Sequence, residues 1–163
     1  MNGVLVTNHV LSGALIGAAV RKPLPAFVVG VASHFVLDAV PHWGDWGDRQ
    51  RFLRIAVADG LAGLAAIGIV AAATPPERRM AILAGMAGAA VPDLDKPAVL
   101  WFGRSPWPGA VNRFHSGIQN EAPDRFGREL TVTAAFAVGL LAVRATRRAS
   151  GRQGRPGWPR RRS

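Results

Sequence analysis

The sequence predicts an all-α protein: a multi-pass transmembrane bundle of about four to five helices, followed by a disordered basic C-terminal tail. Hydrophobic residues make up 49% of the 163 residues and charged residues only 18%, below the roughly 25% typical of soluble domains. The apolar segments are long, rich in alanine and leucine, and lack strict alternation, which indicates helices rather than strands. They are apolar on nearly all sides, as expected of helices buried in a core or a membrane.

Five apolar segments follow one another along the chain, at residues 4–20, 24–40, 55–73, 80–91 and 130–143. A membrane-spanning helix needs about 20 residues, with roughly 17 as the lower limit. The first three segments reach that limit, whereas the last two are short unless the fifth begins near Phe126. Prolines and charges at residues 21–23 and 74–79 end the first and third segments. A soluble all-helical protein with an alanine-rich core is the alternative.

The charge distribution divides the chain into a helical domain at residues 1–146 and an arginine-rich tail at residues 147–163. The net charge is +10, and eight of the twenty basic residues fall in the last twenty positions, among Gly, Pro and Ser. This composition is typical of a solvated segment that contacts anionic lipid headgroups. We therefore expect membrane lipids as partners and no nucleic acid, although a soluble nucleic-acid binder is a weaker alternative.

If the five segments cross the membrane in turn, one side of the membrane receives the tail and two loops, at residues 21–23 and 74–79. That side is rich in Arg and Lys, and Glu77 is its one acid. The positive-inside rule places it in the cytoplasm. The sequence thus predicts a protein of the plasma (inner) membrane with a cytoplasmic tail.

Histidine and aspartate recur at four-residue spacing near the end of the second segment, as His34, Asp38 and His42. Residues i and i+4 share a helix face, so His34 and Asp38 point the same way. Pro41 ends or kinks the helix, and His42 then reaches back from a turn. Imidazole and carboxylate groups bind zinc and similar divalent metals. The alternative is a core histidine beside a capping or solvated acid.

Further candidate ligands fall at the same predicted outer face of the membrane. His9 opens the first segment, Asp93 and Asp95 close the fourth, and His115 follows in the next loop. Asp95 has an alternative role as the N-cap of a short helix. Asp59 is left without a role. The predicted metal ligands are His9, His34, Asp38, His42, Asp93, Asp95 and His115.

Three motifs resemble those of the membrane-bound metal-dependent hydrolases, a family of small bacterial inner-membrane proteins that is distantly similar to zinc-dependent phospholipase C. They are Thr7-Asn8-His9, His34-x3-Asp38-x3-His42, and the segment Gly88-Ala89-Ala90-Val91-Pro92-Asp93-Leu94-Asp95. Family members often carry a His-Arg-x-x-x-His-Ser segment after these motifs. This chain departs from it, with Asn112-Arg113-Phe114-His115-Ser116.

The resemblance implies hydrolysis of a phosphoester or related ester bond by metal-activated water. Asp95 would act as a bridging ligand or general base, and Arg113 would neutralise a phosphate oxygen. Zinc is the first expectation for the metal, with manganese or iron as alternatives. The alternative to an enzyme is a metal-stabilised structural or interaction protein of the membrane.

Overall fold

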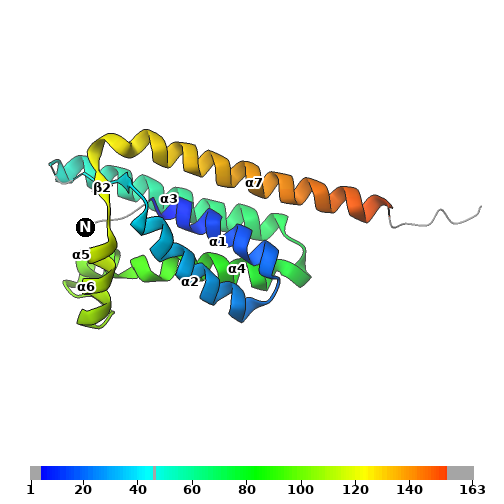
Figure 1. Cartoon of the computed structure of the whole chain (residues 1–163), viewed down its shortest axis with the longest axis horizontal. Coiled ribbons are helices and arrows are strands. Elements are labelled where there is room, and N and C mark those ends of the chain that lie inside the picture. The colour runs from blue at the N-terminus through cyan, green and yellow to red at the C-terminus, as the bar shows by residue number, and fades with distance from the viewer. Residues whose placement is uncertain (1–4, 46, 154–163) are drawn as a thin grey trace, which may run out of the picture.

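The computed structural model describes residues 5–45 and 47–153, and these residues fold into an all-helical structure (Figure 1). The elements in order are α1 (Val6–Val20), α2 (Pro23–Ala39), β1 (His42–Trp43), α3 (Arg49–Ala73), α4 (Pro76–Ala90), η1 (Val91–Leu94), α5 (Asp95–Phe102), α6 (Gly109–Ile118), β2 (Glu121–Ala122), η2 (Pro123–Arg125) and α7 (Phe126–Gln153). The all-α prediction is confirmed, and each of the five apolar segments forms a helix.

Helix α1 is the centre of the bundle and packs against α2, α3, α4 and α7. Buried residues lie on all sides of α1. On the side that faces α4, Val10, Ala14 and Ala18 form a core cluster with Ile82 and Met86. Helices α5 and α6 lie at one end of the molecule, as Figure 1 shows. The metal-site residues predicted from the sequence lie toward this same end.

Glycines allow α4 to pack directly against the backbones of α1 and α2. A Cβ added to Gly30 of α2 would lie 2.5 Å from the carbonyl oxygen of Gly85 and 3.0 Å from the backbone nitrogen of Ala89. A Cβ on Gly13 or Gly88 would likewise overlap backbone atoms of the neighbouring helix. Small residues at helix contacts allow this close approach in membrane proteins.

The structure does not confirm the predicted number of spans. Among the described residues, two helices are long and apolar enough to cross a membrane: Arg49–Ala73 and Pro123–Arg147. Helix α4 has 15 residues, and at 1.5 Å per residue it is about 22 Å long, short of the roughly 30 Å hydrocarbon layer. The structure therefore does not support four or five full spans, because α4 is a short helix packed against α1 and α2.

The predicted tail begins too early. Helix α7 continues past residue 146 and ends at Gln153, so residues 147–153 are helical rather than disordered. The remainder of the predicted tail, residues 154–163, lies outside the described residues.

A two-residue parallel pairing that the sequence did not predict joins the segment after α2 to the segment before α7. His42 pairs with Glu121 and Trp43 with Ala122. Trp43 is buried and stacks on Phe52 at a centroid distance of 5.9 Å. This pairing fixes the backbone beside the predicted metal site.

Candidate metal centre

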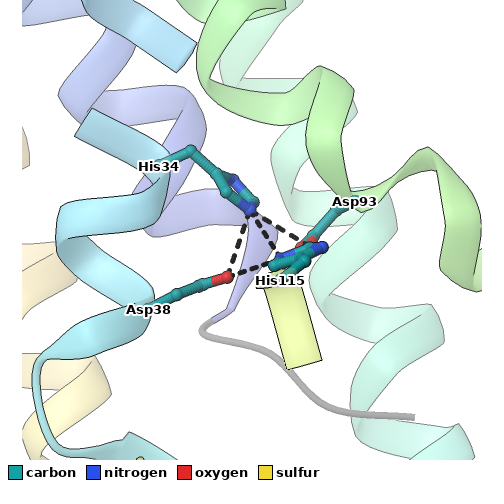
Figure 2. A group of neighbouring side chains, drawn as sticks. All are labelled: His34, Asp38, Asp93 and His115. Atoms are coloured by element: carbon teal, nitrogen blue, oxygen red, sulfur yellow. Dashed lines mark hydrogen bonds and ion pairs between the residues drawn. The ribbon is translucent and has the colours of Figure 1, made fainter. Parts of the chain in front are cut away.

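Four buried side chains converge at the end of the bundle nearest α6. His34 and Asp38 come from α2, Asp93 from η1 and His115 from α6. One donor atom from each lies within 4.8 Å of the donor atoms of the other three. Figure 2 shows the four side chains pointing toward one another. The structure therefore brings together residues that are up to 81 positions apart in sequence.

The distances between these donor atoms fit a small divalent cation. Asp38 Oδ2 lies 3.1 Å from His34 Nε2 and 2.7 Å from His115 Nε2. The two Nε2 atoms are 3.0 Å apart, and Asp93 Oδ1 lies 3.5 Å from each of them. Ligands about 2.0–2.1 Å from a tetrahedral zinc ion are roughly 3.3 Å from one another. These five separations bracket that value, and the sixth, between the Asp38 and Asp93 carboxylates, is within 4.8 Å. The group is therefore of a size that could hold a metal ion.

The sequence explains how α2 and η1 present their ligands. His34 and Asp38 are four residues apart on α2 and therefore share a face, as predicted. Helix α4 ends at Ala90, and Pro92 lies in the tighter 3-10 turn that carries Asp93. The sequence break at Pro92 thus turns the chain so that the Asp93 carboxylate meets the histidines of α2 and α6.

Contacts around α6 position His115. The indole nitrogen of Trp107 donates a hydrogen bond to the Pro92 carbonyl oxygen at 2.9 Å, which ties the start of α6 to the turn that carries Asp93. Phe114 packs edge-on against Phe35 of α2, with ring centroids 5.3 Å apart. These two contacts hold α6 against both other ligand-bearing elements.

Hydrogen bonds outside the donor set orient two of its members. The Nδ1–H of His34 donates to the Ala89 carbonyl oxygen at 2.8 Å, which leaves Nε2 directed at the centre. The Gln119 amide donates to Asp38 Oδ2 at 2.7 Å. Metal-bound histidines usually donate their other ring N–H to a carbonyl or carboxylate in this way. The hydrogen bond to Ala89 therefore leaves His34 oriented as a candidate metal ligand.

His9 joins the site from α1, as the sequence predicted. Its side chain is fully buried, its ring stacks on His34 at a centroid distance of 4.1 Å, and Nε2 lies 3.3 Å from Asp38 Oδ1. Among the described residues, His9 Nε2, Asp38 Oδ1 and Asp93 Oδ1 have no partner with hydrogen-bond geometry. His9 Nε2 nevertheless faces Asp38 Oδ1 at 3.3 Å, and Lys96 Nζ lies 2.5 Å from Asp93 Oδ1. A bound cation would add a further favourable contact for these buried polar atoms.

His42 does not belong to the group of four, contrary to the predicted three-ligand element. Helix α2 ends at Ala39 and β1 begins at His42, so His42 does not continue the helical face that carries His34 and Asp38. Its Nδ1–H donates to the Val40 carbonyl oxygen at 2.8 Å, and Nε2 lies 3.5 Å from Glu121 Oε1. Burial opposes protonation of this ring, but its contacts with Glu121 and Val40 outweigh burial and raise the pKa of His42.

Arg113 does not point into the centre. It is exposed on α6, two residues before His115, and residues two apart lie on different sides of a helix. The cation beside the centre is Lys96, whose Nζ lies 2.5 Å from Asp93 Oδ1. Sequence reasoning missed Lys96, although its position three residues after Asp93 places it one helical turn away.

Asp95 is the first residue of α5 and is not one of the four grouped ligands. Its Oδ1 atom is buried and has no hydrogen-bond partner among the described residues. The prediction that Asp95 is a ligand or base stays a prediction, whereas Asp93 takes the place expected of a ligand.

Two further acids have structural roles. Asp59 of α3 accepts hydrogen bonds from the backbone N–H groups of Val6 and Thr7, at 2.5 and 3.2 Å, and so caps the buried start of α1. Glu129 of α7 is buried and accepts a hydrogen bond from the Asn8 side chain at 2.7 Å. No role for Asp59 could be assigned from the sequence, and Glu129 was not among the predicted functional residues. The clue was the same for both: a lone acid beside or within an apolar segment.

Comparisons with protein-family models, curated proteins and solved structures find no match for this chain. The functional argument therefore depends on the geometry and chemistry of the centre.

Proposed function

We propose that this chain is a multi-pass protein of the plasma (inner) membrane that binds a divalent metal through His34, Asp38, Asp93 and His115, with His9 beside them. The observation that supports this proposal is the convergence of four buried donor atoms at near-tetrahedral separations. Zinc is the metal we propose first, because two imidazoles and two carboxylates suit it. Manganese and iron are the alternatives.

The exposed surfaces of α3 and α7 support the membrane assignment. Leu61, Leu64 and Ile69 of α3 are each more than 60% exposed, and so are Val138 and Leu141 of α7. Large exposed apolar surfaces of this kind are typical of contact with a membrane or a partner protein. We propose that α3 and α7 cross the bilayer, with α1 packed against both of them and α2 and α4 packed against α1 in the apolar layer.

The charge at the two ends supports the orientation that we propose. The ligands lie at the end where α1 begins and α2 and α4 finish, and the basic loops lie at the opposite end. The positive-inside rule then favours a cytoplasmic C-terminus and a metal centre near the outer face.

The activity that we propose is metal-dependent hydrolysis of a phosphoester or ester bond. A divalent metal at the centre supplies a Lewis acid that lowers the pKa of bound water toward neutrality. In this scheme His34, Asp38, Asp93 and His115 hold the ion, and Asp95 accepts the proton. Lys96 takes over the role first given to Arg113, since its ammonium group lies at the centre and can neutralise an anionic substrate oxygen.

A structural metal is the second candidate, and the burial of the centre favours it. Four protein donors complete a tetrahedral zinc site, whereas catalytic sites keep one position for water or substrate. All four side chains of the group are buried. In this second proposal the ion ties α2, η1 and α6 together.

Elemental analysis of detergent-purified protein tests metal binding directly. Wild type should carry zinc in stoichiometric amount, and the double variant His34→Ala/Asp38→Ala should carry almost none. His42→Ala is the matched control, because it removes a buried imidazole outside the group and should retain the metal. Equal metal in wild type and the double variant would contradict the proposal.

Hydrolysis of a chromogenic phosphodiester and a chromogenic ester by zinc-loaded protein separates the two candidates. Catalysis predicts turnover that Asp95→Asn lowers while the metal content stays the same. A structural ion predicts no turnover of either substrate by protein that carries its full zinc content.

A further inference from the structure

Three arginines from three different helices converge at the end of the bundle opposite the metal centre. Arg21 follows the end of α1, Arg78 lies in the first turn of α4, and Arg147 lies near the end of α7. Arg147 donates a hydrogen bond from Nη2 to the Ala18 carbonyl oxygen, which docks it on the end of α1. The start of α4, which carries Arg78, lies against the end of α1, because a Cβ on Gly17 would overlap the Ala81 carbonyl oxygen. We call these three residues the arginine cluster.

The arginine cluster has no acidic partner within the described residues. None of its members forms an ion pair with a carboxylate there. Glu77 is the acid nearest in sequence, and it is exposed at the start of α4. Three guanidinium groups at one end of the bundle without a counter-charge favour an anion bound beside them. The start of α4 adds to this preference, because helix N-termini attract anions.

The position of the cluster indicates where that anion lies. The apolar run of α7 ends at Val143, four residues before Arg147, and the candidate span Arg49–Ala73 ends five residues before Arg78. Both helices therefore leave the apolar layer at the level of the cluster, which is the level of the lipid headgroups. Basic groups at this position bind the phosphates of anionic lipids.

From these observations we infer that the arginine cluster is a binding site for the phosphate headgroup of an anionic phospholipid on the cytoplasmic leaflet. The inference requires the membrane embedding proposed above but not the metal centre. It differs from general attraction by the arginine-rich tail, because the cluster is built by the ends of three packed helices. Guanidinium groups suit this role, since their paired N–H donors match two phosphate oxygens.

Lipid retention by the full-length protein tests the inference. Detergent-purified protein is titrated with phosphatidylglycerol in phosphatidylcholine micelles, and bound lipid is counted by native mass spectrometry. The variant Arg21→Gln/Arg78→Gln/Arg147→Gln should lose phosphatidylglycerol affinity by roughly a hundredfold, since each of the three arginines near an anionic lipid contributes about fivefold. Phosphatidylcholine retention should not change.

The matched control is Arg49→Gln/Arg54→Gln/Arg104→Gln, which removes the same charge from exposed positions outside the cluster and leaves the tail intact. It should keep wild-type affinity. Equal losses in both triple variants would overturn the inference, and so would an undiminished affinity in the cluster variant. Displacement of the lipid by millimolar inorganic phosphate would overturn the assignment to a lipid headgroup.

The metal content of the same samples keeps the two proposals apart. We expect the cluster variant to retain its zinc, because the cluster lies at the other end of the bundle. Protein without zinc that still discriminates phosphatidylglycerol would contradict the metal proposal alone. Recovery of the protein in the soluble fraction without detergent would overturn the membrane assignment and the lipid site together.

Discussion

Replacing Gly30 with alanine tests how the helix packing supports the metal centre. The new Cβ would lie 2.5 Å from the Gly85 carbonyl oxygen and 3.0 Å from the Ala89 nitrogen. Carbon and carbonyl oxygen in contact are about 3.3–3.6 Å apart, so α2 and α4 must separate by roughly 0.8–1.1 Å at this point. His34 is four residues farther along the same face of α2, and its ring bonds Ala89 of α4 at 2.8 Å. A separation of this size lengthens that bond beyond hydrogen-bond range.

The expected cost follows from these two effects. Overpacking costs about 1–3 kcal/mol, and loss of the His34 hydrogen bond adds about 1 kcal/mol. The higher helix propensity of alanine offsets about 1 kcal/mol, so we expect Gly30→Ala to lower the free energy of unfolding by about 1–3 kcal/mol. Zinc affinity should fall by about 10–100-fold, as is typical when the group that orients a metal-bound histidine is lost.

Thermal unfolding in detergent and zinc competition with a chelator measure the two effects. Gly68→Ala is the control, because a Cβ at Gly68 of α3 meets no atom within 4 Å. It should leave zinc affinity unchanged and should not lower the unfolding temperature, since alanine favours a helix over glycine. If the two variants share the same unfolding temperature and zinc affinity, the coupling of packing to the centre is refuted.

Three further predictions concern the metal, the cap of α1 and His42. Chelation should lower the unfolding temperature, and zinc should restore it. At a hundredfold excess over Kd, bound zinc raises the free energy of unfolding by about 2.7 kcal/mol. An unchanged unfolding temperature would argue against a bound ion. Asp59→Ala should cost about 0.5–2 kcal/mol through the lost cap of α1, without loss of metal in elemental analysis. The partners of His42 raise its pKa in the folded protein despite burial. Protonation of His42 therefore stabilises the fold. This stabilisation is complete below the unfolded-state pKa near 6.5 and is lost as the pH rises through the folded-state pKa. In urea titrations, His42→Gln should therefore lower the free energy of unfolding more at about pH 6 than at about pH 8. In protein that also carries Glu121→Gln, this difference between the two pH values should be smaller.

Local patterns predicted the helices well because each apolar segment is bounded by prolines or charges. Residues 24–40, for example, correspond closely to α2 (Pro23–Ala39). Hydropathy could not distinguish a span from a short buried helix. Residues 80–91 are as apolar as the other segments, but the partners of α4 are protein helices reached through Gly85 and Gly88. Which neighbour covers an apolar face is a tertiary property that composition does not encode.

The centre shows the same division between local and long-range information. The i, i+4 spacing correctly placed His34 and Asp38 on one face, because helix geometry depends on nearby residues. The same spacing failed for His42, because the chain is no longer helical there and a strand pairing with Glu121 determines where the ring lies. Glutamine and lysine are common in loops and at helix starts, so Gln119 and Lys96 carry no local signal of their roles. Only the assembled fold places Gln119 against Asp38 and Lys96 against Asp93.

Helix ends account for the position of the metal centre and of the arginine cluster. The last four carbonyl groups of a helix have no partner within it. Ala89 is among the last four residues of α4, and its carbonyl oxygen is therefore free to accept the Nδ1–H of His34. At the other end of the bundle the Ala18 carbonyl of α1 is free for the same reason and accepts the Arg147 side chain. Extending either helix by one turn would occupy that carbonyl, so the breaks at Pro92 and at Arg21–Pro23 are conditions for both sites.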